Sequence, residues 1–275
     1  MATMNDMNFD FADQKIAMAY DEVLVPLLFE PWTKRLMEEN EAWSSRYVLD
    51  LACGTGAVTK HLLNRVTCKG KVFALDLNEE MLAINRAKFE ELGCDDAIEF
   101  IHAPAEAIPI EDNTLDIVVC QQGLQFFPDK LAAAQEVYRT LNTGGKWIVS
   151  TWLPVSECEI MGTLCETLEA INEPELSQMM RLPFDHMPKE ELKALCVKAG
   201  FQKIEIEEQR LELCLKGGLE EAILFVHATP VGLKLKTLSK EKQRAFEEIF
   251  RANVKQRNGT NFGKMVSHVL KAYKQ

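Results

Sequence analysis

Short apolar runs alternate with amphipathic segments through the first half of the chain. Five runs rich in β-branched and aromatic residues predict strands at 47–52, 71–76, 97–103, 115–121 and 146–152. Between them, apolar residues recur at helical spacing over 56–65, 78–93 and 130–142. Near-continuous apolar strands separated by helices are typical of a parallel sheet covered on both faces. The pattern therefore predicts a doubly wound α/β core.

The segments that flank this core are mainly helical. Residues 14–40 have an amphipathic pattern, which we expect to be interrupted around Pro26 and Pro31 because proline removes a helical hydrogen bond. Residues 153–188 predict a helical insertion, and 189–213 predict a helix, a glycine turn and a strand. Further helices are expected at 218–229 and 239–257, with a last strand within 262–274.

Composition and charge narrow the class of protein. The 275 residues are enough for one large domain with an ordinary core, and the net charge of −11 argues against a nucleic-acid partner or an anionic membrane surface. The N-terminus has early acidic residues and no long apolar run, so we expect no signal peptide, no membrane insertion and a cytoplasmic location. The eight cysteines are scattered without a CxxC pair, which favours free thiols and no metal site.

The stretch RYVLDLACGTGAVTKHLL, residues 46–63, begins as a strand, breaks at Gly54 and Gly56, and continues as a helix. In an open parallel sheet, the turn after the first strand is the usual place for a ligand, and glycines let backbone N–H groups approach it closely. Asp76 ends the second strand, where a carboxylate can accept both hydroxyls of a ribose. The residues therefore predict a site for a cofactor that contains a nucleoside.

The details of the turn separate the possible cofactors. A dinucleotide site favours G-x-G-x-x-G or its alanine-ending form, whereas Thr59 occupies the last position here, and no P-loop motif is present. The spacing Asp50-x-x-x-Gly54-x-Gly56 instead resembles motif I of class I S-adenosylmethionine-dependent methyltransferases. VLDLACGTG, VFALDLNEEML, APAEAIPIEDNTLDIVVCQQGLQFFPD and YRTLNTGGKWIVSTW resemble successive motifs of the group that contains quinone-biosynthesis and natural-product enzymes.

This resemblance implies the architecture of the whole chain. It implies a mostly parallel, seven-stranded, Rossmann-like sheet with helices on both faces and a helical lid. We expect one domain overall in four parts: an N-terminal helical lid at 1–45, a cofactor-binding core at 46–152, a helical insertion over the active site at 153–188, and the C-terminal part of the core with additional helices at 189–275.

The resemblance also implies which residues bind S-adenosylmethionine. Asp50 would meet the amino group of the methionine part, Asp76 the ribose, and Leu77 and Met81 the adenine. The full set that it implies comprises Asp50, Ala52, Cys53, Gly54, Thr55, Gly56, Asp76, Leu77, Met81, Ala105, Glu106 and Gln121. Relatives commonly have an aspartate where this chain has Pro104, so adenine recognition would depend on the backbone around Ala105 and Glu106.

Several of these residues also have a purely structural explanation. Asp76 could cap the following helix, although Asn78 suits that role better. Met81 could be both a core residue and a cofactor contact. Tyr20 and Trp32 could pack within the leading helices or line the acceptor pocket.

The activity implied is transfer of a methyl group to a small organic acceptor, with S-adenosylhomocysteine as product. Aligning the acceptor and excluding water would supply most of the catalysis. The candidates on the acceptor side are Tyr20, Trp32, Gln122, Phe126 and Trp152, and the catalytic candidates are Gln125, His186 and His227. A monomer or homodimer is expected. A non-catalytic module that binds S-adenosylmethionine and an NAD-dependent oxidoreductase remain as alternatives.

Overall fold

The computed structural model describes residues 14–37, 46–66, 70–185, 187–256 and 261–275, and the chain divides into two compact units. Unit 1 comprises Met1–Pro31, Trp152–His186 and Gln209–Ser267. Unit 2 comprises Trp32–Thr151, Met187–Glu208 and His268–Gln275.

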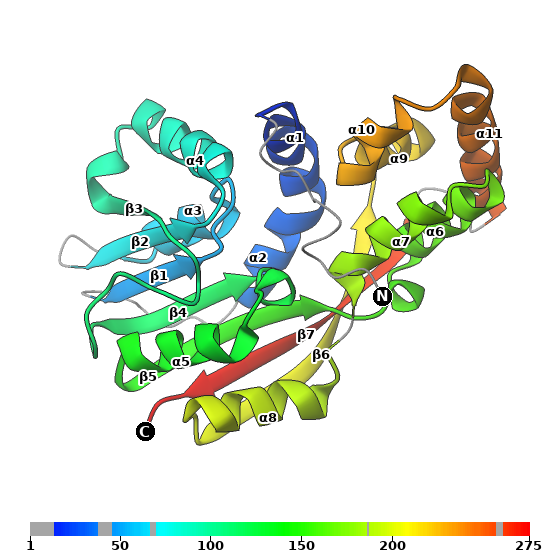
Figure 1. Ribbon diagram of the computed structural model, residues 1–275. Helices are drawn as coiled ribbons and strands as arrows, with labels where there is room; N and C mark the ends of the chain where they lie inside the picture. Colours follow the sequence, from blue (N-terminus) through cyan, green and yellow to red (C-terminus); the bar gives the residue numbers. More distant parts are fainter. Residues whose placement is uncertain (1–13, 38–45, 67–69, 186, 257–260) are drawn as a thin grey trace. The chain divides into compact units, whose positions relative to one another are not determined.

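A seven-stranded sheet runs through the fold in the order β3-β2-β1-β4-β5-β7-β6 (Figure 1). Its strands are β1 (Tyr47–Leu51), β2 (Lys71–Asp76), β3 (Ile98–His102), β4 (Leu115–Gln121), β5 (Leu141–Trp152), β6 (Lys203–Cys214) and β7 (Asn261–Tyr273). The pairs β1–β2, β2–β3, β1–β4 and β4–β5 are parallel. β7 runs in the opposite direction to β5. The backbone N–H of Gly144 in β5 donates to the carbonyl of Lys274, which directly follows β7. The predicted fold class is therefore confirmed.

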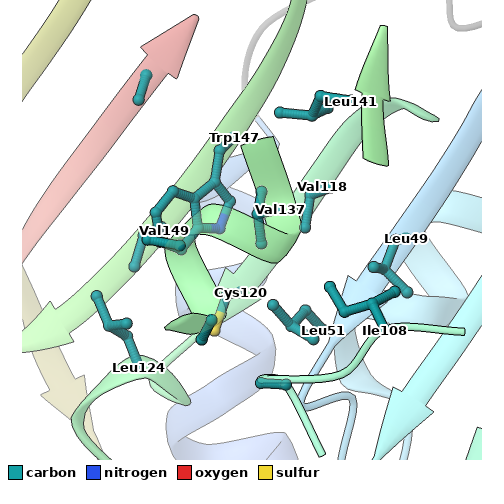
Figure 2. Packing of buried hydrophobic residues seen from close by; sticks show 14 of the residues in the cluster. Leu49, Leu51, Ile108, Val118, Cys120, Leu124, Val137, Leu141, Trp147 and Val149 are labelled. Atoms are coloured by element: carbon teal, nitrogen blue, oxygen red, sulfur yellow. The ribbon is translucent and has the colours of Figure 1, made fainter. Parts of the chain in front are cut away.

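Two hydrophobic clusters cover the two faces of the sheet in unit 2. The first, which we call the α5/α8 cluster, contains Leu51, Leu75, Cys120 and Val149 of the strands and is shown in Figure 2. The second, the α3/α4 cluster, contains the strand residues Val48, Ala74, Val119 and Ile148. Because successive side chains of a strand point to opposite faces, each apolar run supplies both clusters.

The helices of unit 2 begin and end at recognisable residues. They are α3 (Ala57–Leu63), α4 (Glu79–Glu91), α5 (Lys130–Thr140), α8 (Lys189–Ala199) and most of α2 (Glu30–Leu36), with short 3₁₀ turns η2 (Asp95–Ala97) and η3 (Leu124–Phe126). Asn78 caps α4 by accepting from the N–H of Met81, and Asp129 caps α5. α8 ends at Gly200, whose φ of 114° is the left-handed conformation that glycine favours at this position.

The C-terminal end of the chain is tied to unit 2 by a buried lysine. Lys274 Nζ donates to the carbonyl oxygens of Leu141 (2.7 Å) and Tyr138 (2.8 Å) and to Asn113 Oδ1 (2.8 Å). Burial lowers the pKa of this amine. The last residues of the chain therefore satisfy carbonyl groups where α5 ends and β5 begins.

The helices of unit 1 come from three separate stretches of the chain. They are α1 (Gln14–Ala19), η1 (Tyr20–Phe29), η4 (Val155–Glu157), α6 (Glu159–Ala170), α7 (Pro174–Arg181), η5 (Leu182–Phe184), α9 (Gly218–His227), α10 (Pro230–Leu235) and α11 (Lys240–Gln256). α6 packs against α7 and α11, and α9 packs against α10 and η1. Among the described residues, no helix has the length and apolarity needed to cross a bilayer.

Most predicted elements are present within a few residues of the expected bounds, but three expectations were wrong in detail. The interruption expected around Pro26 and Pro31 does not occur, because Pro26 lies inside the π-helical η1 and Pro31 in the first turn of α2, where no backbone donor is needed. β5 begins at Leu141 rather than 146, and its pairing with β4 is irregular near its start, where Gly144 has a φ of 83°. α10 was not expected.

Candidate active site

The turn after β1 has an unusual backbone that brings N–H groups to the edge of the sheet. Ala52, Gly54 and Gly56 have φ values of 58°, 52° and 93°, a left-handed conformation that is costly for residues with a Cβ. A Cβ at Gly56 would also collide with the carboxamide of Asn85, whereas a Cβ at Gly54 would meet no atom within 4 Å. Glycine is therefore required sterically at 56 and conformationally at 54.

Beneath this turn lies a buried polar network. Asp50 on β1 is only 1% exposed, and its Oδ2 accepts a 2.6 Å hydrogen bond from the hydroxyl of Thr59 on α3. Asn85 Nδ2, from α4, lies 3.4 Å from Thr59 Oγ1 and donates to the carbonyl of Gly54 at 3.3 Å. Burial raises the pKa of Asp50 to about 7, and the negative charge of Asp76 adds to this effect while the Thr59 bond opposes it.

Cys53 completes the buried side of the turn. Its thiol is buried and accepts a 3.4 Å contact from Asn85 Nδ2. Burial raises the pKa of the Cys53 thiol, and the nearby Asp50 and Asp76 carboxylates raise it further. The thiol is therefore neutral at ordinary pH, which makes it a packing group rather than a nucleophile.

Asp76 stands at the opposite side of the turn, where β2 ends. Its Oδ2 accepts from the N–H of Gly54 at 2.7 Å, and its Oδ1 accepts from the N–H of Asn78 at 2.8 Å. Burial raises the pKa of Asp76, although these backbone bonds partly offset the effect. Two carboxylate oxygens offer about four lone-pair positions, so the group retains capacity for further donors.

The residues expected near an adenine differ in exposure. Leu77 directly follows Asp76 and is 63% exposed, whereas Met81 is buried in the first turn of α4. Ala105 is buried in the α5/α8 cluster, so its side chain is used in packing. The carboxylate of Glu106 accepts from the N–H of Asp129, the N-cap residue of α5, at 3.2 Å.

The register of the sheet brings four polar residues to one face and one edge. Four polar residues lie on the face of the sheet that the α3/α4 cluster covers, because each comes two residues after a strand residue of that cluster. They are Asp50, Asp76, Gln121 and Ser150. In the register of the sheet, Asp50 is paired with the residue two positions before Asp76 on β2 and with the residue two positions before Gln121 on β4. Gln121 is paired directly with Ser150 on β5. Gln121 Oε1 also accepts from the hydroxyl of Thr33 on α2 at 3.0 Å.

Two further glutamines follow β4. Gln122 has a φ of 56°, and its N–H donates to the carbonyl of Ser150 at 3.0 Å. Gln125 Nε2, from η3, donates to Gln122 Oε1 at 3.4 Å. Both side chains are buried, and Phe126 beside them is 37% exposed.

The remaining predicted residues fall into different parts of the chain. Trp32 belongs to unit 2 and is fully buried. Tyr20 and Trp152 belong to unit 1, where Phe29 contacts both rings at centroid distances of 4.9 and 6.5 Å. His227 also belongs to unit 1, while His186 lies outside the described residues.

Several buried polar atoms at the carboxyl ends of the strands have no hydrogen-bond partner in the described part of the chain. They are Thr55 Oγ1, Asn85 Oδ1, Gln125 Oε1 and Ser150 Oγ. Buried polar groups in proteins are nearly always paired, so a concentration of unpaired ones at one edge of a sheet indicates a place where a ligand or water binds. Within the described ranges, by contrast, no three His, Cys, Asp or Glu side chains gather as a metal site would need.

The sequence profile of the ubiE/COQ5 methyltransferase family matches residues 4–214. This chain belongs to that family. The ubiquinone/menaquinone biosynthesis C-methyltransferase UbiE of Shewanella sp. (strain W3-18-1) is 30% identical over 185 residues, covering 63% of this chain and 73% of the relative. The corresponding enzyme of Shewanella woodyi is 31% identical over 207 residues, covering 69% and 81%.

Solved structures show the same fold at lower identity. The YcgJ protein of Bacillus subtilis has a TM-score of 0.59 and 18% identity, covering 89% of this chain and 99% of that one. The phosphoethanolamine N-methyltransferase 2 of Haemonchus contortus, solved in complex with S-adenosyl-L-methionine, has a TM-score of 0.63 and 15% identity, covering 100% of this chain and 61% of that one.

Membership of the ubiE/COQ5 methyltransferase family decides between the alternatives left open by the sequence. The protein is an S-adenosylmethionine-dependent methyltransferase and transfers the methyl group to a small-molecule acceptor. The edge of the sheet fits this cofactor chemically, since it offers backbone N–H groups, a carboxylate with spare lone pairs and the unpaired Thr55 hydroxyl.

Sequence reasoning missed three polar residues of this ubiE/COQ5 family member. We used Thr59 only to argue against a dinucleotide, whereas its hydroxyl bonds Asp50, and its position in the motif was the available signal. Asn85 and Ser150 gave no local signal, because a single polar residue in an amphipathic helix or at a strand end is common.

Proposed function

We propose that the cofactor lies along the edge formed by β2, β1 and β4, in the orientation that the family resemblance implies. Asp76 would accept the ribose hydroxyls, Asp50 would face the amino group, and Leu77 would cover the adenine. The support for this proposal is that Asp76 already orders the turn through Gly54, which couples ribose binding to the turn that receives the rest of the cofactor.

The test is calorimetry with S-adenosylmethionine, S-adenosylhomocysteine and NADH on the wild type and on Asp76→Asn. The asparagine keeps the size of the side chain but loses the charge, so each charge-assisted bond to ribose should weaken by about 1 kcal/mol. We expect at least about a tenfold loss in affinity for S-adenosylhomocysteine, and circular dichroism shows whether the variant is folded. Unchanged affinity in a folded variant would place the ribose elsewhere.

We further propose that the acceptor is a hydroxylated aromatic ring, of the kind that a reduced quinone presents, and that a ring carbon receives the methyl group. The names of the UbiE relatives support this proposal.

When bound, S-adenosylmethionine supplies a methyl carbon whose bond to sulfur breaks, with the electron pair kept by sulfur, as its bond to the acceptor forms. The protein has to align the ring, exclude water and receive the proton that the ring carbon loses. His227 remains our candidate for the proton. Burial lowers the pKa of His227, which keeps the imidazole neutral at pH 7, and its Nδ1 has no partner among the described residues.

The test of the acceptor class uses 1,4-naphthohydroquinone under anaerobic conditions with isotopically labelled S-adenosylmethionine. A product methylated at the carbon next to a hydroxyl supports the proposal. A product methylated on oxygen, or no product from a protein that binds the cofactor, would refute it. If His227 receives the proton, His227→Asn should lower kcat while leaving the affinity for S-adenosylhomocysteine unchanged.

Three further proposals concern the partner, the oligomeric state and the location of the protein. The net charge of −11 favours a small molecule over nucleic acid as partner. A monomer or homodimer is expected, which size-exclusion chromatography with light scattering measures. Cell fractionation tests the cytoplasmic location.

A further inference from the structure

The side-chain carboxamides of Gln122 and Gln125, the two glutamines that follow β4, are hydrogen-bonded to each other, and one oxygen of the pair has no partner among the described residues. Gln125 Nε2 donates to Gln122 Oε1 at 3.4 Å, while Gln125 Oε1 has no partner in the described structure, although the residue is only 6% exposed. A buried acceptor left without a donor costs stability, so such an atom calls for a ligand or water that supplies the donor.

The backbone around the pair supports a functional role. Gln122 holds a φ of 56°, a strained conformation that persists where surrounding contacts enforce it and that gathers at functional sites. Here the contact is the bond from the Gln122 N–H to the carbonyl of Ser150 at 3.0 Å. Ser150 is fully buried, and its own Oγ is also without a partner among the described residues.

The pair lies beside the cofactor turn but away from the proposed ribose end. Gly123, between the two glutamines, approaches the turn so closely that a Cβ there would lie 2.6 Å from the Cβ of Ala52. β4 is the second strand from β2 in the sheet, and strands are spaced by about 4.8 Å, so the end of β4 lies roughly 10 Å from Asp76. The unused oxygen of Gln125 is therefore at the side of the turn where an acceptor, rather than the nucleoside, is expected.

We propose that Gln125 Oε1 accepts a hydrogen bond from a hydroxyl of the acceptor and thereby selects the reduced form of the ring. Nε2 already donates to Gln122, so Oε1 is the atom of this side chain that is left without a partner among the described residues. A hydroquinone O–H can satisfy that oxygen, whereas a quinone carbonyl would place two acceptors against each other. This inference rests on the proposed function, since it takes the substrate to be a hydroxylated ring.

The test measures binding without turnover, using two redox-inert probes. Calorimetry on the complex with S-adenosylhomocysteine compares 1-naphthol, which carries a donor, with 1-methoxynaphthalene, which does not. The wild type should prefer 1-naphthol by about tenfold or more, the range expected when a buried acceptor gains a donor. Gln125→Met, which has no acceptor oxygen, should bind both probes equally.

Gln135→Met is the matched control, because Gln135 lies exposed on α5 and its replacement should leave the preference intact. Affinity for S-adenosylhomocysteine shows that each variant is folded, and Gln125→Ala replaces Gln125→Met if that variant loses it. A preference that survives in the methionine or alanine variant, or a wild type without any preference, would overturn the proposal. Failure of the wild type to methylate 1,4-naphthohydroquinone would refute the proposed function instead, and the probe preference would still report on Gln125.

Discussion

Replacing Asp50 with asparagine should make the free protein more stable at neutral pH while weakening cofactor binding. Asp50 is buried on β1, has a pKa of about 7, and faces no cation in the hydrogen bond that it makes with Thr59. The folded protein therefore holds an unfavourable negative charge above pH 7. We propose that the ammonium group of S-adenosylmethionine compensates this charge when the cofactor is bound.

The magnitude follows from the two pKa values. In the unfolded chain an aspartate ionises near 3.8, whereas in the folded protein Asp50 does so near 7. Between these values the folded state binds more protons than the unfolded state, so the free energy of unfolding falls as the pH rises, by about 4 kcal/mol in all. Asparagine has the same shape and no charge, so we expect Asp50→Asn to gain roughly 1–4 kcal/mol over wild type at pH 8 and almost nothing at pH 4.

Denaturant unfolding of both proteins at pH 4, 5, 6, 7 and 8 measures the gain, and calorimetry with S-adenosylhomocysteine measures binding. Wild-type affinity should rise from pH 6 to 7.5 as Asp50 ionises, because the ligand's α-ammonium group keeps its proton over this range. The rise should be absent in Asp50→Asn, which should also bind more weakly. A variant no more stable than wild type at pH 8, or a stability difference that does not change with pH, would refute the reasoning.

Two further predictions concern the folded state alone. Gly54→Ala should lower the free energy of unfolding by about 1–2 kcal/mol, because alanine is strained at the left-handed φ of this position. Gly56→Ala should lower it clearly more, because the new Cβ must also displace Asn85. Thermal unfolding compares the two variants, and equal losses would mean that Asn85 moves freely. Lys274→Met should lower the free energy of unfolding by roughly 2–4 kcal/mol, because it leaves buried carbonyl groups without a donor. The control Lys198→Met, on the exposed face of α8, should lower it little. Similar denaturation midpoints for the two lysine variants would contradict this prediction.

The fold was predictable because its signals are local. The strands of the core are apolar runs, the helices between them have a 3.6-residue pattern, and Asn78 and Asp129 cap α4 and α5 where a polar residue precedes the helix. Where prediction failed, non-local contacts decided the outcome. β5, for example, extends back to Leu141 because Leu141 pairs with Leu115 of β4 across an irregular register.

The sequence by itself determined the glycine turn, the positions of Asp50 and Asp76 at strand ends, and the family resemblance. These depend on residue type and spacing, which a single stretch of chain displays. Only the tertiary structure decided that Asp76 holds the N–H of Gly54, that Thr59 bonds Asp50, and that the Gln125 oxygen is buried without a partner. Such facts depend on the register of paired strands and on helices that meet from distant parts of the chain, and neither is encoded in local periodicity.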